Sequence, residues 1–434
     1  MSGLRPRERD AIVQALRAGV VPKLGLRHIQ VGRAREIEEM VRDMDRIAGG
    51  GATIRFVIGD YGSGKTFFMN LVRLVALEKG LVVMFADLAP DRRLHASAGQ
   101  ARGLYAEMAR NLSTRTRPDG GALASVVERF VSQAHQEADA RDLPTASVIR
   151  EKLAHFEELT GGFDFAQVIR RYWEGHETGD EDLKSAALRW LRGEFATRTD
   201  ARKALGIRTI VDDAGIYDQL KLMAEFVLAA GYKGLLVGLD EMVNLYKLNS
   251  AQARNANYEQ ILRILNDVLQ GSARHLGFLM GGTPEFLMNT RRGLYSYEAL
   301  QSRLAANSFV RDGLVDLSGP VIRLTNLTQE DLFVLLSNVR AVMQDEAEML
   351  PDEALEAFMA HCHERIGEAY FRTPRNTVTA FVNMLAVLQQ NPGLAWTDLI
   401  GSLSLSEDRG EDMADIDEET GAQPPEEDLV SFRL

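Results

Sequence analysis

Five short apolar runs in this chain are typical of buried strands, and stretches with helical periodicity lie between them. The runs cover residues 53–58, 81–86, 235–239, 276–280 and 321–324. Their apolar residues follow one another without alternation, as in strands that are buried on both faces of a parallel sheet. Because helical stretches separate the runs, we expect an α/β fold in which helices cover both faces of a parallel sheet.

Apolar residues recur at helical spacing through most of the remaining chain. They predict helices over 6–20, 34–48, 67–79 and 220–230, and three more over 329–344, 352–366 and 374–390. Between residues 90 and 213, helical stripes alternate with loops, and no run there is typical of a strand. We interpret this stretch as a helical insertion in the core and the last three helices as a small helical lid.

The chain is thereby divided into six parts. They are an N-terminal helical segment (1–30), two parts of the core (31–89 and 214–324), the insertion (90–213), the lid (325–391) and a linker with an acidic tail (392–434). Within the tail, residues 407–428 have few apolar groups and predict disorder. The apolar tip at 429–434 is either a peptide that docks, for example as an added strand, or an unattached end.

Residues 59–66 match the phosphate-binding pattern G-x-x-x-x-G-K-[ST] at every fixed position, between a predicted strand and a predicted helix. The glycines let backbone N–H groups surround phosphate oxygens, and the new helix presents its positive end to the same anion. Lys65 can reach the β- and γ-phosphates, and Thr66 can bind Mg²⁺. The predicted nucleotide-binding residues of this loop are Gly59, Asp60, Tyr61, Gly62, Ser63, Gly64, Lys65, Thr66 and Phe67.

The third apolar run ends in two acids, Asp240 and Glu241. A carboxylate at a strand end beside the phosphate loop can hold the magnesium shell, and we assign this role to Asp240. Glu241 is the candidate base that orients the attacking water. Thr283, which follows the fourth run, either bonds near the γ-phosphate or is an ordinary residue at a strand end. Asp87, at the end of the second run, either touches the metal shell or caps the next loop.

Phosphate transfer also needs positive charge where negative charge spreads in the transition state. The spacing along the chain does not choose among six candidate arginines. They are Arg291, Arg292, Arg303, Arg311, Arg372 and Arg375.

Composition narrows the class of protein. The 434 residues are 45% hydrophobic and 26% charged, as in globular proteins of two or three domains. A single cysteine, Cys362, excludes an internal disulfide, and the charged start and the lack of an apolar run of membrane-spanning length favour a cytoplasmic protein. We expect no contact with membranes.

Charge is distributed unevenly. From Glu407 to Leu434, eleven acidic and two basic residues account for nine of the twelve net negative charges, so the rest of the chain is almost neutral. The first forty residues are locally basic, which indicates either a solvated face or a contact with nucleic acid. Their basic residues are Arg5, Arg7, Arg9, Arg17, Lys23, Arg27, Arg33 and Arg35.

The order of these motifs resembles that of AAA+ ATPases, especially the origin-recognition and clamp-loader members. By that resemblance Val31, Gly32 and Arg33 lie against the adenine. Arg303, which follows Ser302, matches an arginine finger that acts on ATP bound by a neighbouring subunit. Arg375, after Pro374, matches a second sensor that contacts the γ-phosphate of its own subunit. The resemblance therefore implies a homo-oligomer, as a ring or an open ring, that binds ATP and Mg²⁺.

At finer grain the chain resembles the ATP-binding protein family of BREX bacteriophage-exclusion systems. The resemblance is carried by residues 15–19, 59–66, 86–88, 231–235 with 240–241, and 296–300 with 302–304. It implies an ATPase of anti-phage defence that hydrolyses Mg-ATP at a subunit interface and loads or switches a DNA-processing partner such as a helicase. Two alternatives stay open, which are an assembly module latched by ATP with little turnover and a signalling ATPase that senses infection and activates an effector.

One departure from the origin-recognition pattern concerns DNA. Only residues 391–405 lie between the predicted lid and the acidic tail, which is too short for a winged-helix domain. Direct contact with DNA would therefore use the basic N-terminal segment, the centre of a ring or the helical insertion.

Overall fold

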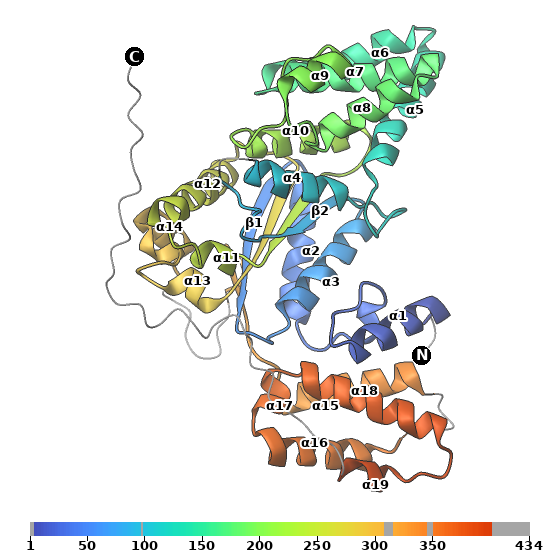
Figure 1. The fold of residues 1–434 in the computed structure, drawn as a ribbon, viewed down its shortest axis with the longest axis vertical. Helices are drawn as coiled ribbons and strands as arrows, with labels where there is room; N and C mark the ends of the chain where they lie inside the picture. The colour runs from blue at the N-terminus through green and yellow to red at the C-terminus, as the bar shows by residue number, and fades with distance from the viewer. Residues whose placement is uncertain (1–3, 97–98, 308–315, 345–349, 402–434) are drawn as a thin grey trace.

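The computed structural model of the protein describes residues 4–96, 99–307, 316–344 and 350–401. The predicted disordered tail at 407–428, the apolar tip at 429–434 and Arg311 lie outside the described residues. Figure 1 shows the helical insertion at one end of the molecule, the sheet in the middle and the lid helices at the other end.

A parallel sheet organises the core. Its strands are β1 (Ala52–Gly59), β2 (Val82–Asp87), β3 (Leu235–Asp240), β4 (Leu276–Gly282) and β5 (Val321–Leu324). They lie in the order β2-β3-β4-β1-β5, and every neighbouring pair is parallel. All five predicted strands are therefore present, and the predicted α/β fold class is confirmed.

Alternate residues of each strand pack into two different hydrophobic clusters, which explains why the runs are continuously apolar. In β1, Phe56 and Ile58 belong to one cluster, whereas Val57 between them belongs to the other. Helices α2 (Ala34–Ala48) and α3 (Lys65–Glu78) pack on the Val57 face. The Phe56 face is covered by helices from three separate parts of the chain. These are α4 (Gln100–Arg110), α10 (Ile216–Ala229) and α12 (Ala251–Leu269).

The cluster on the Phe56 face continues into the helical insertion, so the insertion and the sheet share one core. Phe165 of the insertion, for example, makes an edge contact with Phe226 of α10, with ring centroids 5.6 Å apart. Helix α4, the first helix of the predicted insertion at 90–213, packs directly against β2. The other helices of the insertion are α5 (Leu123–Arg141), α6 (Thr145–Leu153), α7 (Gly162–Thr178), α8 (Glu181–Leu191) and α9 (Arg198–Leu205). Three short helices follow β3 and β4, namely α11 (Val243–Tyr246), α13 (Pro284–Met288) and α14 (Glu298–Leu304).

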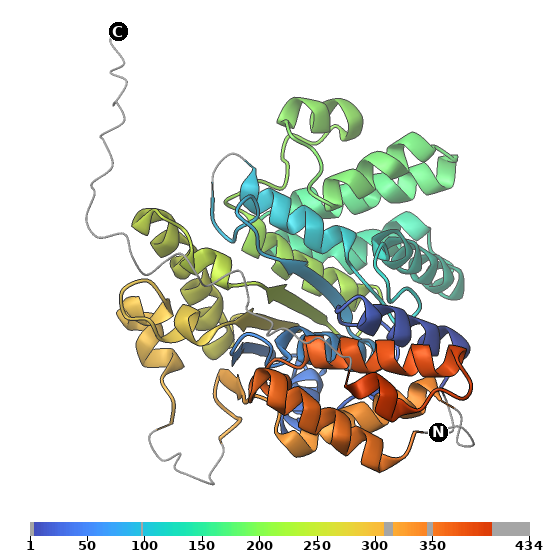
Figure 2. The same ribbon diagram turned by 60° about the horizontal axis from the view of Figure 1, so that its bottom comes forward.

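The lid and the N-terminal helix form a third hydrophobic cluster. The predicted lid at 325–391 contains α15 (Gln329–Met343), α16 (Asp352–Ile366), α17 (Ala369–Arg372) and α18 (Arg375–Gln390). A further helix, α19 (Trp396–Ile400), lies in the predicted linker and packs against the same cluster. Helix α1 (Pro6–Arg17) buries Ile12 in this cluster and packs against α15 and α18. Figure 2 shows α1 in dark blue beside the red lid helices. None of the described helices is long and apolar enough to cross a membrane.

Helix α1 ends earlier than its apolar stripe predicts. The stripe predicts a helix to residue 20, but the helix stops at Arg17 because Gly19 takes a left-handed conformation with φ 66°. Val20 consequently leaves the stripe and is 56% exposed. Its side chain is thus available to the site described next.

Candidate nucleotide site

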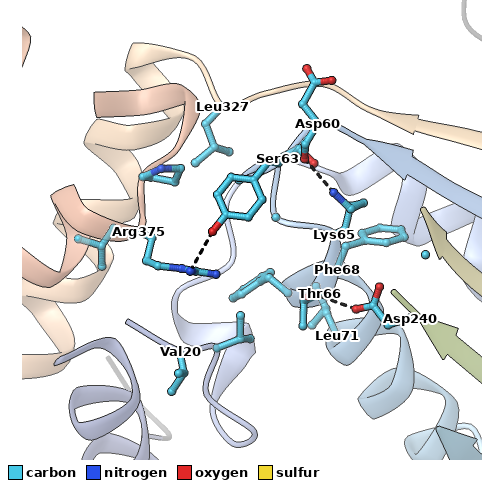
Figure 3. A pocket seen from close by; sticks show the side chains of 18 of the residues that line it. Val20, Asp60, Ser63, Lys65, Thr66, Phe68, Leu71, Asp240, Leu327 and Arg375 are labelled. Carbon is cyan, nitrogen blue, oxygen red and sulfur yellow. Dashed lines mark hydrogen bonds between the residues drawn. The ribbon is translucent and has the colours of Figure 1, made fainter. Parts of the chain in front are cut away.

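A cavity of about 460 Å³ lies where the phosphate loop, the strand ends, the lid and the N-terminal segment meet. The cavity is lined by most of the predicted phosphate loop and by Asp240 and Glu241. Val31, Arg33, Thr283 and Arg375 also line it, whereas Arg303 does not. The structure therefore brings together residues that are separated by more than 300 positions in sequence (Figure 3).

The phosphate loop depends on two glycines in the left-handed region, Gly62 with φ 79° and Gly64 with φ 83°. A side chain at Gly62 would also meet the lid, since an added Cβ would lie 2.8 Å from Cγ2 of Thr373. The hydroxyl of Ser63 lines the cavity, is buried, and makes no hydrogen bond among the described residues. An unpaired buried hydroxyl is costly, so a ligand oxygen at this position would stabilise the loop.

Lys65 points back over the loop. Its Nζ donates hydrogen bonds to the backbone carbonyls of Gly59 and Asp60, both at 2.8 Å. Burial lowers the pKa of the Lys65 ammonium, while the carboxylates of Asp240 and Glu241 act in the opposite direction. A desolvated ammonium whose hydrogen bonds in the described residues go to neutral carbonyls is well suited to an incoming polyphosphate, whose charge would compensate for the lost water.

Thr66 and Asp240 provide hard oxygen ligands at the start of α3 and the end of β3. The Thr66 hydroxyl donates to Oδ2 of Asp240 at 3.0 Å (Figure 3). Within the described part of the chain, no cluster of three His, Cys, Asp or Glu side chains could hold a metal. Magnesium commonly uses one or two protein oxygens and takes further ligands from substrate phosphates and water, so this pair fits Mg²⁺ that arrives with a nucleotide.

Glu241 adopts a left-handed backbone conformation, with φ 57°, which is unfavourable for a residue with a side chain. Its amide donates to Oδ1 of Asp240 at 2.9 Å, and the next amide, of Met242, donates to the carbonyl of Gly281 at 3.0 Å. These bonds hold the strained turn and direct the Glu241 side chain to the cavity wall. Non-glycine residues in this conformation concentrate at functional sites.

The lid reaches the phosphate loop through Arg375, the first residue of α18. Its Nη1 donates to the phenol oxygen of Tyr61 at 3.1 Å, and its guanidinium lies 5.7 Å from the centroid of the Tyr61 ring. Phe67, in the first turn of α3, packs against the lid cluster as well. Through both contacts the lid packs directly against the phosphate loop and the first turn of α3.

Only part of the segment predicted to lie against the adenine lines the cavity. Val31 and Arg33 line the cavity, whereas Gly32 is exposed and lies outside the lining. The Arg33 guanidinium is occupied by protein oxygens, which include the side-chain oxygen of Thr325 at 3.2 Å and the backbone carbonyl of Ser63 at 3.4 Å.

Thr283 lines the cavity and also caps α13, because its hydroxyl oxygen accepts a hydrogen bond from the amide of Phe286 at 3.3 Å. The cap leaves the hydroxyl proton available to a ligand, so both interpretations of this residue remain compatible with the structure. Asp87 pairs in register with Asp240 across β2 and β3. Burial raises the pKa of Asp87, and the neighbouring Asp240 raises it further.

Of the described candidate arginines, only Arg375 lines the cavity. Arg303 is exposed on α14, and its Nη1 donates to the carbonyl of Ala299 at 2.8 Å. Arg292 is held by the carbonyls of Tyr246 and Leu248, both at 3.2 Å. Arg372 pairs with Glu368 one turn earlier in the chain, at 2.5 Å.

Sequence reasoning missed the apolar end of the cavity. One wall is formed by the end of α1 and the segment after it, and the opposite wall comes from the lid. The apolar lining residues are Leu16, Val20, Val21, Pro22, Ile29, Leu327, Leu335 and Val378. The break at Gly19 and Pro22 shows in the sequence that the apolar stripe ends there. The sequence around the break does not show that this segment packs against α18. There the Thr379 hydroxyl donates to the carbonyl of Leu16 at 2.9 Å.

Comparison with known proteins adds one match. The family of the BREX system ATP-binding protein BrxC/D matches the chain over residues 4–404. The matched segment includes the phosphate loop, Asp240 and Glu241, Arg303 and the lid. No curated protein matches the chain.

Proposed function

We propose that this chain, which belongs to the BREX system ATP-binding protein BrxC/D family, hydrolyses Mg-ATP and uses the cycle to load or switch a DNA-processing partner in phage defence. The family is one of ATP-binding proteins in a phage-defence system. The observation that carries the proposal for hydrolysis is the 3.0 Å contact between Thr66 and Asp240, which sets the phosphate loop beside the Asp240-Glu241 turn.

The cavity has the polarity that ATP requires. Its polar end holds Lys65, Thr66 and the loop amides, which suit the triphosphate, and its apolar end holds Val20 and Val378, which suit the base. Mg²⁺ bound by Thr66 and Asp240 would neutralise charge on the β- and γ-phosphates. The Glu241 carboxylate would take a proton from the attacking water. At the same time the water oxygen would bond to the γ-phosphorus, and the bond from the γ-phosphorus to the β–γ bridging oxygen would break.

We propose that the site is completed by a neighbouring subunit. Arg375 is the one described candidate arginine at the cavity, and Arg303 is exposed on α14, away from the cavity of its own chain. Its exposure leaves it accessible to another copy of the chain, and we propose that it acts there on ATP, in a ring or an open ring. Arg375 would contact the γ-phosphate of its own subunit.

Turnover, with and without duplex DNA, tests the proposed chemistry. Wild-type protein is expected to release phosphate, and Glu241→Gln is expected to bind ATP but to lose roughly a hundredfold or more in rate. Hydrolysis by Glu241→Gln at the wild-type rate would remove the assigned base. ATP binding without turnover in the wild type would instead favour an assembly module that is latched by ATP.

Mixing of inactive chains tests the subunit interface. Lys65→Ala and Arg303→Ala chains, each inactive alone, are expected to regain part of the turnover when they co-assemble. Arg274→Ala, at an exposed arginine elsewhere on the core, is the control and should stay active alone. Failure to recover in chains shown to co-assemble contradicts the role of Arg303. The mass of the assembly with ATP, and with the candidate helicase added, tests the partner.

A further inference from the structure

Arg33 connects the start of α2, the phosphate loop and the segment between the core and the lid. It is the N-cap of α2, and its backbone is left-handed, with φ 63°. Its side chain is only 14% exposed. We propose that Arg33 is a positioning residue that holds the core-to-lid connection against the phosphate loop. The proposal deepens the proposed function, because it rests on the cavity being the ATP site.

The guanidinium of Arg33 binds the first residue after the last strand. Nη2 donates to the backbone carbonyl of Thr325, and Nη1 donates to its side-chain oxygen at 3.2 Å. Nη2 also reaches the backbone carbonyl of Ser63, in the phosphate loop, at 3.4 Å. Glu36, one turn along α2, lies 3.7 Å from Nη1 and orients the group. One planar group thus joins the loop to the connection.

Thr325 occupies the point where the core ends and the lid begins. Strand β5 stops at Leu324, and α15 starts at Gln329 with Thr328 as its N-cap. The next residue, Asn326, donates from Nδ2 to Oδ2 of Asp60 at 3.3 Å. Two consecutive residues of a four-residue connection are therefore tied to the phosphate loop, one through Arg33 and one directly.

Only an arginine satisfies this geometry. Its rigid fork donates in two directions within one plane, whereas a lysine presents a single point charge on a flexible stem. The described donors at Nη1 and Nη2 are directed at protein oxygens, so the side chain acts on the protein frame more than on the base. By fixing Thr325, Arg33 fixes the angle at which the lid leaves the core, and thereby the approach of Arg375 to the loop.

A distance measurement between spin labels tests the proposal without any nucleotide. Cysteines replace Gln270, exposed at the end of α12 in the core, and Glu364, exposed on α16 in the lid. Native Cys362 can stay, because it is buried and burial raises the pKa of its thiol to about 12. Arg33→Lys and Arg33→Ala are expected to broaden the distance distribution, whereas Arg35→Ala, at an exposed arginine of the same helix, should not. A distribution in Arg33→Ala as narrow as in the wild type overturns the proposal.

Nucleotide binding provides the second readout. If Arg33 positions the loop and the lid, Arg33→Ala lowers affinity for ATP and for inorganic tripolyphosphate together, by roughly tenfold. If Arg33 instead contacts the base, only the affinity for ATP falls, and the proposal is wrong. Failure of the wild type to bind ATP would contradict the proposed function alone, and the label distances would still decide the role of Arg33.

Discussion

The phenol oxygen of Tyr61 accepts a hydrogen bond from Arg375 at 3.1 Å, so the phosphate loop and the last lid helix are joined by two side chains that both face the cavity. A phosphate oxygen is a charged acceptor and binds a guanidinium more strongly than a neutral phenol does. Nucleotide binding therefore competes with this contact. In the nucleotide-free protein, Tyr61 keeps Arg375 close to the proposed position of the γ-phosphate.

Removal of the phenol oxygen should tighten ATP binding. Tyr61→Phe keeps the ring under the guanidinium but loses the competing acceptor, so ATP affinity is expected to rise by about fivefold, the value of one net hydrogen bond. Titration calorimetry measures the change. The same substitution in an Arg375→Ala background should have no effect, and an equal effect in both backgrounds would show that Tyr61 does not act through Arg375.

The strained turn at Glu241 predicts opposite changes in activity and stability. Glu241→Gly should lose hydrolysis but raise the free energy of unfolding of the nucleotide-free protein by about 1 kcal/mol, because glycine adopts the left-handed conformation without strain. Glu241→Ala is the matched control, since it loses the carboxylate but keeps a Cβ. Denaturant unfolding measures the free energy of unfolding of each variant, and phosphate release measures its activity. Equal stabilities for the two variants would show that the turn is not strained.

Asp87 predicts a dependence of stability on pH. Its pKa is raised in the native protein by burial and by Asp240, so the native state binds this proton more tightly than the unfolded chain does. The stabilisation from protonation is complete below the unfolded pKa and is lost as the pH rises through the raised native pKa. Asp87→Asn should therefore raise the melting temperature at pH 7, and the difference should shrink as the pH falls. Weaker binding of magnesium in this variant would instead place Asp87 in the metal shell.

The apolar end of the cavity predicts separate recognition of the base. Val20→Asn should weaken ATP binding by roughly fivefold, because the base would lose an apolar contact worth about one buried methylene group. The affinity for tripolyphosphate should stay constant, because tripolyphosphate has no base. Folding should not change, because Val20 is 56% exposed. Val334→Asn, at a valine of the lid that is 46% exposed and lies outside the cavity, is the control for a surface substitution. A parallel loss of tripolyphosphate affinity would contradict a contact with the base.

Local patterns were sufficient to predict the sheet and the proximity of the loop at 59–66 to Asp240. The loop at 59–66 is contiguous, and the carboxyl ends of parallel strands meet at one edge, so Asp240 could be placed beside Thr66 from sequence alone. The strand order could not be predicted, because each apolar run is equally suited to every position in a buried sheet. Nor could the conformation of Glu241 or the partners of Arg33 be predicted, since both depend on contacts with residues far along the chain.

The packing of α1 on the lid has a consequence for synthesis of the protein. Leu16 and Thr379, which bond across the cavity wall, are 363 residues apart. At about 5–20 residues per second, the first segment leaves the ribosome tens of seconds before its partner helix exists. During that interval its apolar stripe lacks the lid helices on which it packs in the native protein, so the apolar end of the nucleotide site is among the last parts of the molecule to form.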